Sequence, residues 1–304
     1  MAARTIQRHS TWLSRYARLL IGTALCWLMA ERAACAQNAV QPPPLLEPEA
    51  ARNASLWREE WPQFRLSEGI LTAAAALGAG AILLAGPLDE PRWQGGILFD
   101  NAVRNELRGR SAHTRQTFRT IGDNTYHFSP ILPVLDIVVA AVAHGDGKLA
   151  TNLAMLTLEA YSYTGFTYYA STEIFGRARP DSRCNTPGGE CETQSFYGGH
   201  AAISATGAGL VCANHTRFAL FGNPVLDVAA CALAATNALL TGSTRIVADR
   251  HYASDIIVGT GLGFGFGYGV PVLLHYSYGK ASESLGVGPD PNCGPNCIGV
   301  HGTF

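Results

Sequence analysis

The segment that decides the fold reads T-R-I-V-A-D-R-H-Y-A-S-D and occupies residues 244–255. It places His251 six residues after Arg245 and four residues before Asp255. If a helix begins near Tyr252, His251 and Asp255 lie one turn apart on one face. A carboxylate there can fix the imidazole tautomer and leave the second ring nitrogen free to react. The spacing favours a histidine nucleophile beside an anion-binding arginine; an ordinary helix start with solvated arginines is the alternative.

Two upstream segments contain residue types that would complete an anion site. Pro180 is expected to end a helix and to leave Arg179 at its terminus. Gly198 and Gly199 allow backbone N–H groups to approach a ligand where a new helix begins, and a helix start attracts anions. His200, at the same place, can donate a proton to a leaving group. Taken singly, each segment is more often a plain helix stop or start than a functional site.

The composition indicates a folded chain and argues against nucleic acid as a partner. Of the 304 residues, 47% are hydrophobic and 15% are charged, which excludes a disordered chain. The net charge is −1 and no polybasic block is present, whereas binding to a phosphate backbone requires clustered cations.

The eight cysteines do not form a C-x-x-C pair, so neither a zinc ribbon nor a thioredoxin-like protein is expected, and no residue is predicted to bind a metal. Two pairs are close enough in sequence to form small disulfides in an oxidising compartment. A third pair, on neighbouring predicted helices, is expected to be small buried side chains. In order, these pairs are Cys184 with Cys191, Cys293 with Cys297, and Cys212 with Cys231.

The ends of the chain differ from its centre. Residues 1–36 combine several arginines, an apolar run and Ala34-Cys35-Ala36, which predicts an export signal cleaved after Ala36; an uncleaved membrane anchor is the alternative. Residues 37–66 contain three consecutive prolines and are predicted to form a linker or surface arm. Residues 278–304 are rich in Gly, Pro and Asn and are expected to be irregular.

Between these ends, the sequence predicts an all-α bundle of about six core helices. The predicted helices cover residues 69–87, 131–144, 149–173, 200–214, 225–241 and 252–275. No strand alternation of any length is present. In an up-down bundle, the end of the third helix and the starts of the fourth and sixth lie at one end. A site at that end is therefore expected to include Arg179, His200, Arg245, His251 and Asp255.

The sequence favours an exported, periplasmic or envelope-associated bundle that is largely water-soluble. Asp136, Glu159 and Asp227 fall in the middle of predicted helices, where a membrane span would disfavour them. In addition, six spans after an exported N-terminus would place the Cys184–Cys191 loop in the reducing cytoplasm. The alternative is an integral multi-pass membrane protein, because the charge content is low and residues 69–87 could span a bilayer.

The three segments together resemble the motifs of the type 2 phosphatidic acid phosphatase (PAP2) superfamily, which includes bacterial acid phosphatases and vanadium haloperoxidases. The family motifs are K-x6-R-P, P-S-G-H and S-R-x5-H-x3-D. Here they read T-E-I-F-G-R-A-R-P, Y-G-G-H and T-R-I-V-A-D-R-H-Y-A-S-D, within residues 67–277. Thr172 stands where the family has lysine, Tyr197 and Gly198 where it has proline and serine, and Thr244 where it has serine.

The resemblance implies a metal-independent phosphatase without a cofactor. It implies hydrolysis of a phosphate monoester, either a lipid phosphate or a small ester, through a phosphohistidine at His251. Asp255 would orient that histidine and His200 would protonate the leaving group. The phosphate would be bound by Arg179, Arg245, Gly198 and Gly199, with Arg177 a candidate to replace the lysine. Membrane association and oligomeric state stay open, and the alternatives are a vanadate-dependent haloperoxidase and a catalytically weakened envelope protein.

Overall fold

A computed structural model describes residues 55–59, 61, 64–184, 186 and 189–276, and the backbone of residues 286–289 and 298–301. The predicted export signal at 1–36 and the Cys293–Cys297 pair lie outside these residues, as does most of the predicted linker. The described end of that linker, before the first described helix, packs into the bundle through Trp57 and Trp61. Both tryptophans contact Phe218 and Tyr276.

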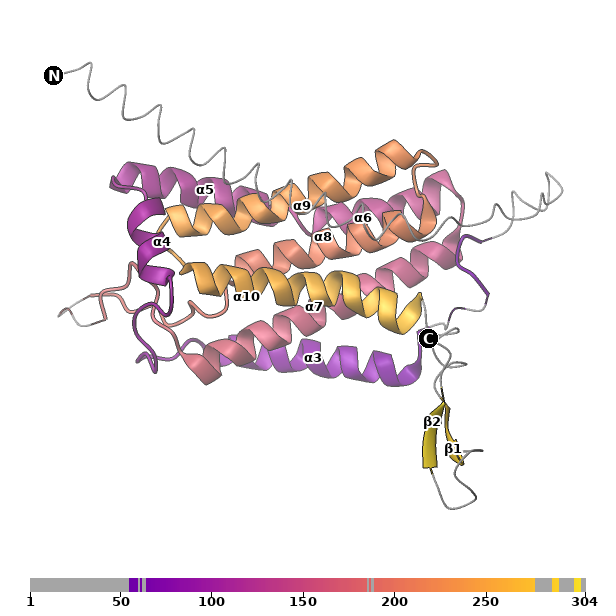
Figure 1. Ribbon diagram of the computed structural model, residues 1–304, viewed down its shortest axis with the longest axis horizontal. Helices are drawn as coiled ribbons and strands as arrows, with labels where there is room; N and C mark the ends of the chain where they lie inside the picture. Colours follow the sequence, from indigo (N-terminus) through magenta and orange to yellow (C-terminus); the bar gives the residue numbers. More distant parts are fainter. Residues whose placement is uncertain are drawn as a thin grey trace. The chain divides into compact units, whose positions relative to one another are not determined.

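The predicted all-α bundle is confirmed for the described core (Figure 1). The polar stretch between the first two predicted core helices forms two more helices, α4 and α5. The α-helices are α3 (Leu66–Ala85), α4 (Asp100–Leu107), α5 (Ala112–Phe128), α6 (Ile131–Val138), α7 (Gly147–Phe175), α8 (Gly199–Phe218), α9 (Pro224–Val247) and α10 (Ala253–Phe264). Short π-helical turns extend α6 and α10: η1 (Val139–Ala143), η2 (Gly265–Gly269) and η3 (Pro271–His275).

The C-terminal tail is not wholly irregular, contrary to the sequence prediction. Strands β1 (Gly286–Pro289) and β2 (Ile298–His301) pair antiparallel. β-branched residues in both strands favour extended backbone, and the Gly-, Pro- and Asn-rich sequence between them suits a connection.

Helix α8 is the centre of the bundle. It packs against α5, α6, α7, α9 and α10, and nearly all of its residues are buried. The glycines of α10 and its extension explain how close this packing is. A Cβ atom on Gly263 would lie 2.1 Å from the carbonyl oxygen of Ala202, and one on Gly267 would lie 2.1 Å from that of Thr206. Glycine at these two positions is therefore what allows the two backbones to meet.

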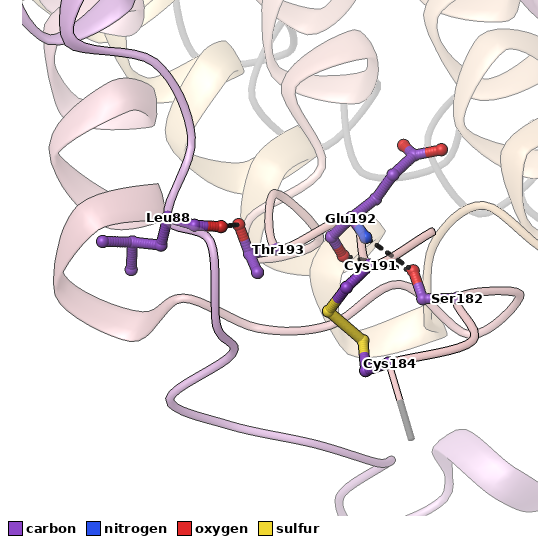
Figure 2. Close-up of a disulfide and its surroundings, with 6 residues drawn as sticks. All are labelled: Leu88, Ser182, Cys184, Cys191, Glu192 and Thr193. Atoms are coloured by element: carbon purple, nitrogen blue, oxygen red, sulfur yellow. Dashed lines mark hydrogen bonds between the residues drawn. A yellow bond between two sulfur atoms is a disulfide. The ribbon is translucent and has the colours of Figure 1, made fainter. Parts of the chain in front are cut away.

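Two disulfides are present among the described residues. The expected Cys184–Cys191 bond is one of them, and the segment that follows it is anchored where Thr193 Oγ1 donates to the carbonyl of Leu88 at 2.9 Å (Figure 2). Cys212 and Cys231 are buried, as predicted, but they are also bonded to each other, which was not expected. They form the second disulfide because α8 and α9 bring their Cα atoms to 4.4 Å.

The outer surface of the bundle supports the multi-pass membrane alternative. Within the described part of the chain, four helical segments are long and apolar enough to cross a bilayer: Leu66–Ala85, Ala112–Ala143, Pro224–Val247 and Ala253–His275. Large apolar side chains cover their outward faces; on α3, Leu77 is 75% exposed and Leu84 is 89% exposed. Such a surface is unusual for a water-soluble protein.

The charged residues that argued for a water-soluble bundle face its interior instead. Asp136 and Asp227 both contact the ring of His215, at 3.1 and 2.6 Å. Glu159 lies 3.0 Å from His275 Nε2. Because each carboxylate has a buried partner, none is exposed to lipid, and mid-helix charge does not exclude spans here.

Candidate active site

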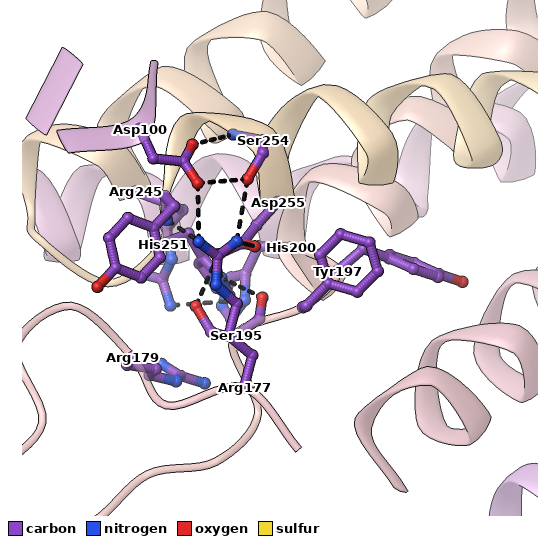
Figure 3. Close-up of polar contacts among 12 residues, drawn as sticks. Asp100, Arg177, Arg179, Ser195, Tyr197, His200, Arg245, His251, Ser254 and Asp255 are labelled. Atoms are coloured by element: carbon purple, nitrogen blue, oxygen red, sulfur yellow. Dashed lines mark hydrogen bonds and ion pairs between the residues drawn. The ribbon is translucent and has the colours of Figure 1, made fainter. Parts of the chain in front are cut away.

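The three predicted segments meet at one end of the bundle (Figure 3). The loop after α7 supplies Arg179, the start of α8 supplies His200, the end of α9 supplies Arg245, and the loop before α10 supplies His251. Gly176, in the left-handed conformation, ends α7. The helix therefore stops earlier than Pro180 would require, and Arg179 lies in a loop.

His251 has one ring nitrogen engaged and one free. Its Nδ1 lies 2.9 Å from the carbonyl oxygen of Ser195. A carbonyl only accepts, so Nδ1 carries the proton and Nε2 carries the lone pair. Nε2 is buried and has no hydrogen-bond partner among the described residues. Burial, followed by the charges of Arg179 and Arg245, holds the pKa of His251 well below its usual value. The ring is therefore a neutral base in a cationic environment.

Asp123 on α5 organises the second histidine and the second arginine. Its Oδ1 accepts from Arg245 Nη1 at 2.7 Å and lies 3.3 Å from His200 Nε2. Arg245 Nη2 lies 3.5 Å from His200 Nδ1, and the ring of Tyr126 lies 4.4 Å from the imidazole. His200 is thus fixed between a carboxylate and a guanidinium.

Arg179 is held by a different carboxylate, Glu192, which follows the disulfide residue Cys191. Its Nε lies 3.1 Å from Glu192 Oε2. Arg250 Nη2 donates to the same oxygen, and Arg250 Nη1 donates to Asp181 at 3.0 Å. Burial opposes ionisation of Glu192, but the hydrogen bond from Arg250 and the charge of Arg179 outweigh it and lower the pKa of Glu192. Each predicted phosphate-binding arginine is therefore positioned by an acid from outside the three motifs.

Arg177 does not replace the missing lysine, contrary to the prediction. Its side chain is fully buried and pairs with Asp100 at 2.7 Å and with Asp255. The guanidinium lies 4.0 Å from the ring centre of Trp93 and 4.1 Å from that of Tyr252. With both carboxylates and both ring faces engaged, Arg177 ties the segment after α7 to α4 and α10.

Asp255 acts on the backbone around His251 more than on its ring. Its Oδ2 lies 3.9 Å from His251 Nδ1, too far for a hydrogen bond. The same oxygen accepts from Ser195 Oγ at 2.7 Å and from the backbone N–H of Tyr252 at 2.9 Å. The predicted direct orientation of His251 by Asp255 is therefore replaced by an indirect one, through the Ser195 segment.

The start of α8 differs from the prediction at one position. The N–H of Gly198 donates to the carbonyl of Asp255 at 3.0 Å, so it does not face a phosphate. A Cβ on Gly198 would lie 2.9 Å from Ile256 Cδ1, so the serine of the family motif would be crowded here. Gly199 begins α8, and N–H groups of a first helical turn lack helical partners. The predicted anion site at this terminus therefore rests on that turn.

Thr172, in place of the family lysine, does not offer a substitute group to the site. It is buried, and its hydroxyl donates to the carbonyl of Tyr169 at 2.8 Å within α7. The cationic groups that the motifs contribute are thus Arg179 and Arg245.

Arg104 on α4 joins the two loops that carry Arg179 and His251. It contacts both carboxylate oxygens of Asp249, at 2.6 and 2.9 Å, and donates to the carbonyl of Pro180 at 2.7 Å. The guanidinium therefore fixes the distance between the two loops.

Sequence reasoning missed the residues that position the site from outside the motifs. No spacing in the sequence connects them to the arginines and histidines, so no sequence signal could have found them. These residues are Asp100, Arg104, Asp123 and Glu192.

A helical bundle with two arginines and a buried histidine nitrogen at one end is suited to bind an oxyanion. Residues 153–278 match the model of the PAP2 superfamily, which confirms the resemblance seen in the motifs. A comparison with solved structures finds the crystal structure of a transmembrane PAP2-type phosphatidylglycerolphosphate phosphatase from Bacillus subtilis. It shares 17% identity at a TM-score of 0.43, over 68% of this chain and 94% of that chain. A comparison with curated proteins gives no match.

The groups gathered at the site have the chemistry that phosphoryl transfer needs: a nucleophile candidate, a proton donor and two guanidinium groups. Among the described residues, no group of three or more His, Cys, Asp or Glu side chains is placed to hold a metal ion.

Proposed function

We propose that the chain is a metal-independent phosphatase that hydrolyses a phosphate monoester through a phosphohistidine at His251. The observation that carries the proposal is the buried Nε2 of His251, unpartnered among the described residues, in the field of Arg179 and Arg245. The match of residues 153–278 to the PAP2 superfamily supports phosphatase chemistry at this site.

In the first step, the Nε2 lone pair attacks phosphorus and the bond from phosphorus to the ester oxygen breaks. Arg179 and Arg245 would bind the non-bridging oxygens, whose negative charge they match in the transition state. Burial and the charge of Arg245 lower the pKa of His200 to about 3, and the negative charge of a bound ester would raise it again. His200, protonated with the ester bound, would give its proton to the departing alkoxide, so the alcohol leaves neutral. The imidazolium formed at His251 is stabilised by the Nδ1–H bond to the carbonyl of Ser195.

In the second step, water attacks the phosphohistidine. His200, now neutral, takes a proton from that water, and the bond from phosphorus to nitrogen breaks. Inorganic phosphate leaves, and both histidines return to their starting protonation states.

A lipid phosphate is the substrate class that the rest of the bundle favours. The outer helices expose apolar side chains along segments long enough to span a bilayer. An enzyme in that position meets phosphate esters whose alcohol is anchored in the same membrane.

The test is phosphate release from a lipid phosphate and from a soluble ester by the purified full chain in detergent, with a chelator present. His251→Ala is expected to abolish release, and His200→Ala to reduce it by about 10²–10⁴-fold. His113→Ala, an exposed histidine on α5, is the control. An alkaline quench of the wild type should trap phosphate on His251. Full activity of His251→Ala would contradict the proposal.

The same assay separates the alternatives. Vanadate is expected to inhibit release as a phosphate mimic, whereas halide oxidation that depends on added vanadate would favour a haloperoxidase. Absence of release from every ester by a folded protein would favour a catalytically weakened envelope protein.

A further inference from the structure

A polar pocket of about 430 Å³ lies beside the candidate active site. No large apolar side chain lines it among the described residues, so it does not suit an acyl chain. The charged residues of its lining are Arg119, Asp181, Arg183, Glu190, Glu192 and Arg250.

The pocket shares residues with the region that would hold the phosphoryl group. Glu192 lines the pocket and also contacts Arg179 at 3.1 Å. Arg250 lines it too and immediately precedes His251. A substrate with its phosphoryl group on Arg179 would therefore lie beside this pocket.

Two of the acids in the pocket are already paired with arginines. Asp181 contacts Arg250 at 3.0 Å. Glu192 contacts Arg250 and Arg179. Because both acids are engaged in these ion pairs, neither fully neutralises the other two arginines of the lining.

The other two arginines of the pocket are exposed. Arg119 lies on α5 and Arg183 just before Cys184, and neither has an ion pair or a side-chain hydrogen bond among the described residues. Glu190 is the acid of the lining without an ion pair among the described residues, and the charge of Arg119 also acts on Glu192. The pocket thus offers guanidinium groups with free donors, which match carboxylate or phosphate oxygens.

We infer that this pocket is a leaving-group subsite that selects phosphate esters whose alcohol carries a second anionic group. Arg119 and Arg183 bind that group while Arg179 and Arg245 hold the phosphoryl group that is transferred. The Cys184–Cys191 bond ties the residue after Arg183 to the residue before Glu192, which keeps the two anion sites at a fixed separation. The inference rests on the proposed phosphatase function for its orientation of the substrate.

A matched pair of ligands tests the subsite without turnover. Propane-1,3-diol bisphosphate and propyl phosphate have the same carbon chain and differ in one phosphate. Their dissociation constants would be measured by calorimetry in detergent. The protein is the full chain carrying the His251→Ala substitution, so that neither ester is consumed. The bisphosphate is expected to bind about tenfold more tightly, the value of one strong charge-assisted contact.

Substitutions in the pocket give the second half of the test. Arg119→Gln with Arg183→Gln should bring the two dissociation constants to within about twofold of each other, and Glu190→Gln should widen the gap, because it removes the opposing charge. Arg115→Gln, one helical turn before Arg119, is the matched control and should keep the gap. Equal affinities in the parent, or a gap that survives the double substitution, would overturn the subsite.

These outcomes are distinct from failure of the proposed function. If the wild type releases no phosphate from any ester but the affinity gap responds to Arg119 and Arg183 as expected, the subsite stands and the phosphatase does not. If the wild type releases phosphate but the two ligands bind with equal affinity, the phosphatase function stands and the subsite does not.

Discussion

The Nδ1 nitrogen of His251 lies 2.9 Å from the carbonyl oxygen of Ser195, and this contact fixes which nitrogen of the ring can react. The serine side chain extends the relationship, because its hydroxyl donates to Asp255 at 2.7 Å. Asp255 thus holds the segment that holds the histidine. Sequence spacing alone suggests a direct His–Asp pair, and the geometry replaces it with a chain of three residues.

Asp255→Asn is expected to damage stability more than His251→Ala does. The change leaves the buried charge of Arg177 without one of its two carboxylates, a loss of about 3 kcal/mol or more. His251→Ala leaves the buried carbonyl of Ser195 without its donor, a cost of about 1–3 kcal/mol, but it leaves no buried charge unpaired, so its effect on unfolding should be the smaller one. Thermal unfolding in detergent measures both. An Asp255→Asn protein as stable as the wild type but inactive would instead indicate direct action on the ring.

Arg177→Gln and Arg179→Gln should have different effects, although the residues are two positions apart. Arg177 is enclosed by Asp100, Asp255 and two aromatic rings, so its loss should lower the melting temperature sharply. Arg179 lies beside the reactive histidine, so its loss should weaken inorganic phosphate binding by about tenfold or more and leave the fold intact. Calorimetry gives the phosphate affinity of each variant, and thermal unfolding gives its melting temperature. Weaker phosphate binding in a stable Arg177→Gln protein would contradict the assignment.

The motifs predicted the convergence of Arg179, His200, Arg245 and His251 because helix termini in an up-down bundle alternate between two ends. They did not predict which acids position the arginines. Those acids come from α5 and from the loop before α8, and only the packed structure brings them to the arginines: Asp123 and Glu192. Arg177 was misassigned for the same reason, since its partner Asp100 is distant in sequence.

The acid limb of the pH profile of kcat/KM should lie below the usual pKa of histidine. In the proposed mechanism His251 attacks in its neutral form, and burial together with Arg179 and Arg245 lowers its pKa. The neutral form therefore persists to pH values below about 6.5, and kcat/KM should be lost only as pH falls through the lowered pKa.

Arg179→Gln checks this origin of the limb. The change removes one positive charge, raises the pKa of His251, and should move the limb upward by about one pH unit. Profiles of both proteins on one ester measure the shift, because ionisation of the substrate is common to both. An unmoved limb would show that another group controls it.

Extraction of the protein from cells should require detergent. Within the described chain, four helical segments are long and apolar enough to span a bilayer, and α3 presents large apolar side chains to its surroundings. Osmotic shock followed by detergent solubilisation, with each fraction probed by immunoblot, gives the answer. Recovery of the folded protein in the shock fluid would restore the water-soluble interpretation.

The sequence misled on this point for a physical reason. Asp136, Glu159 and Asp227 look incompatible with spans when each helix is considered alone. Their partners, His215 and His275, lie on other helices, and the pairing hides each charge inside the bundle. The sequence shows that these charges are present, whereas only the packed structure shows which side chain pairs with each of them.

The glycines of α10 provide a matched pair of substitutions on one helix. Gly263→Ala would place a Cβ atom 2.1 Å from the backbone oxygen of Ala202, a clash that side-chain rotation cannot relieve. The helices must separate, and the expected cost is about 2–3 kcal/mol or more. Gly261→Ala meets nothing within 4 Å, so it should stabilise the helix by roughly 0.5–1 kcal/mol through its better helix propensity.

Unfolding and phosphate release of these two variants, measured in one detergent, test the close contact between α8 and α10. Ala202 and His200 both lie in the first turn of α8, so a displacement of that turn also moves the proposed proton donor. Only Gly263→Ala should therefore lower both the unfolding midpoint and the rate of phosphate release. Gly261 faces open space on the same helix. If both variants had the same unfolding midpoint and the same rate of phosphate release, the backbones of α8 and α10 would be farther apart than the 2.1 Å between a Cβ on Gly263 and the oxygen of Ala202 implies.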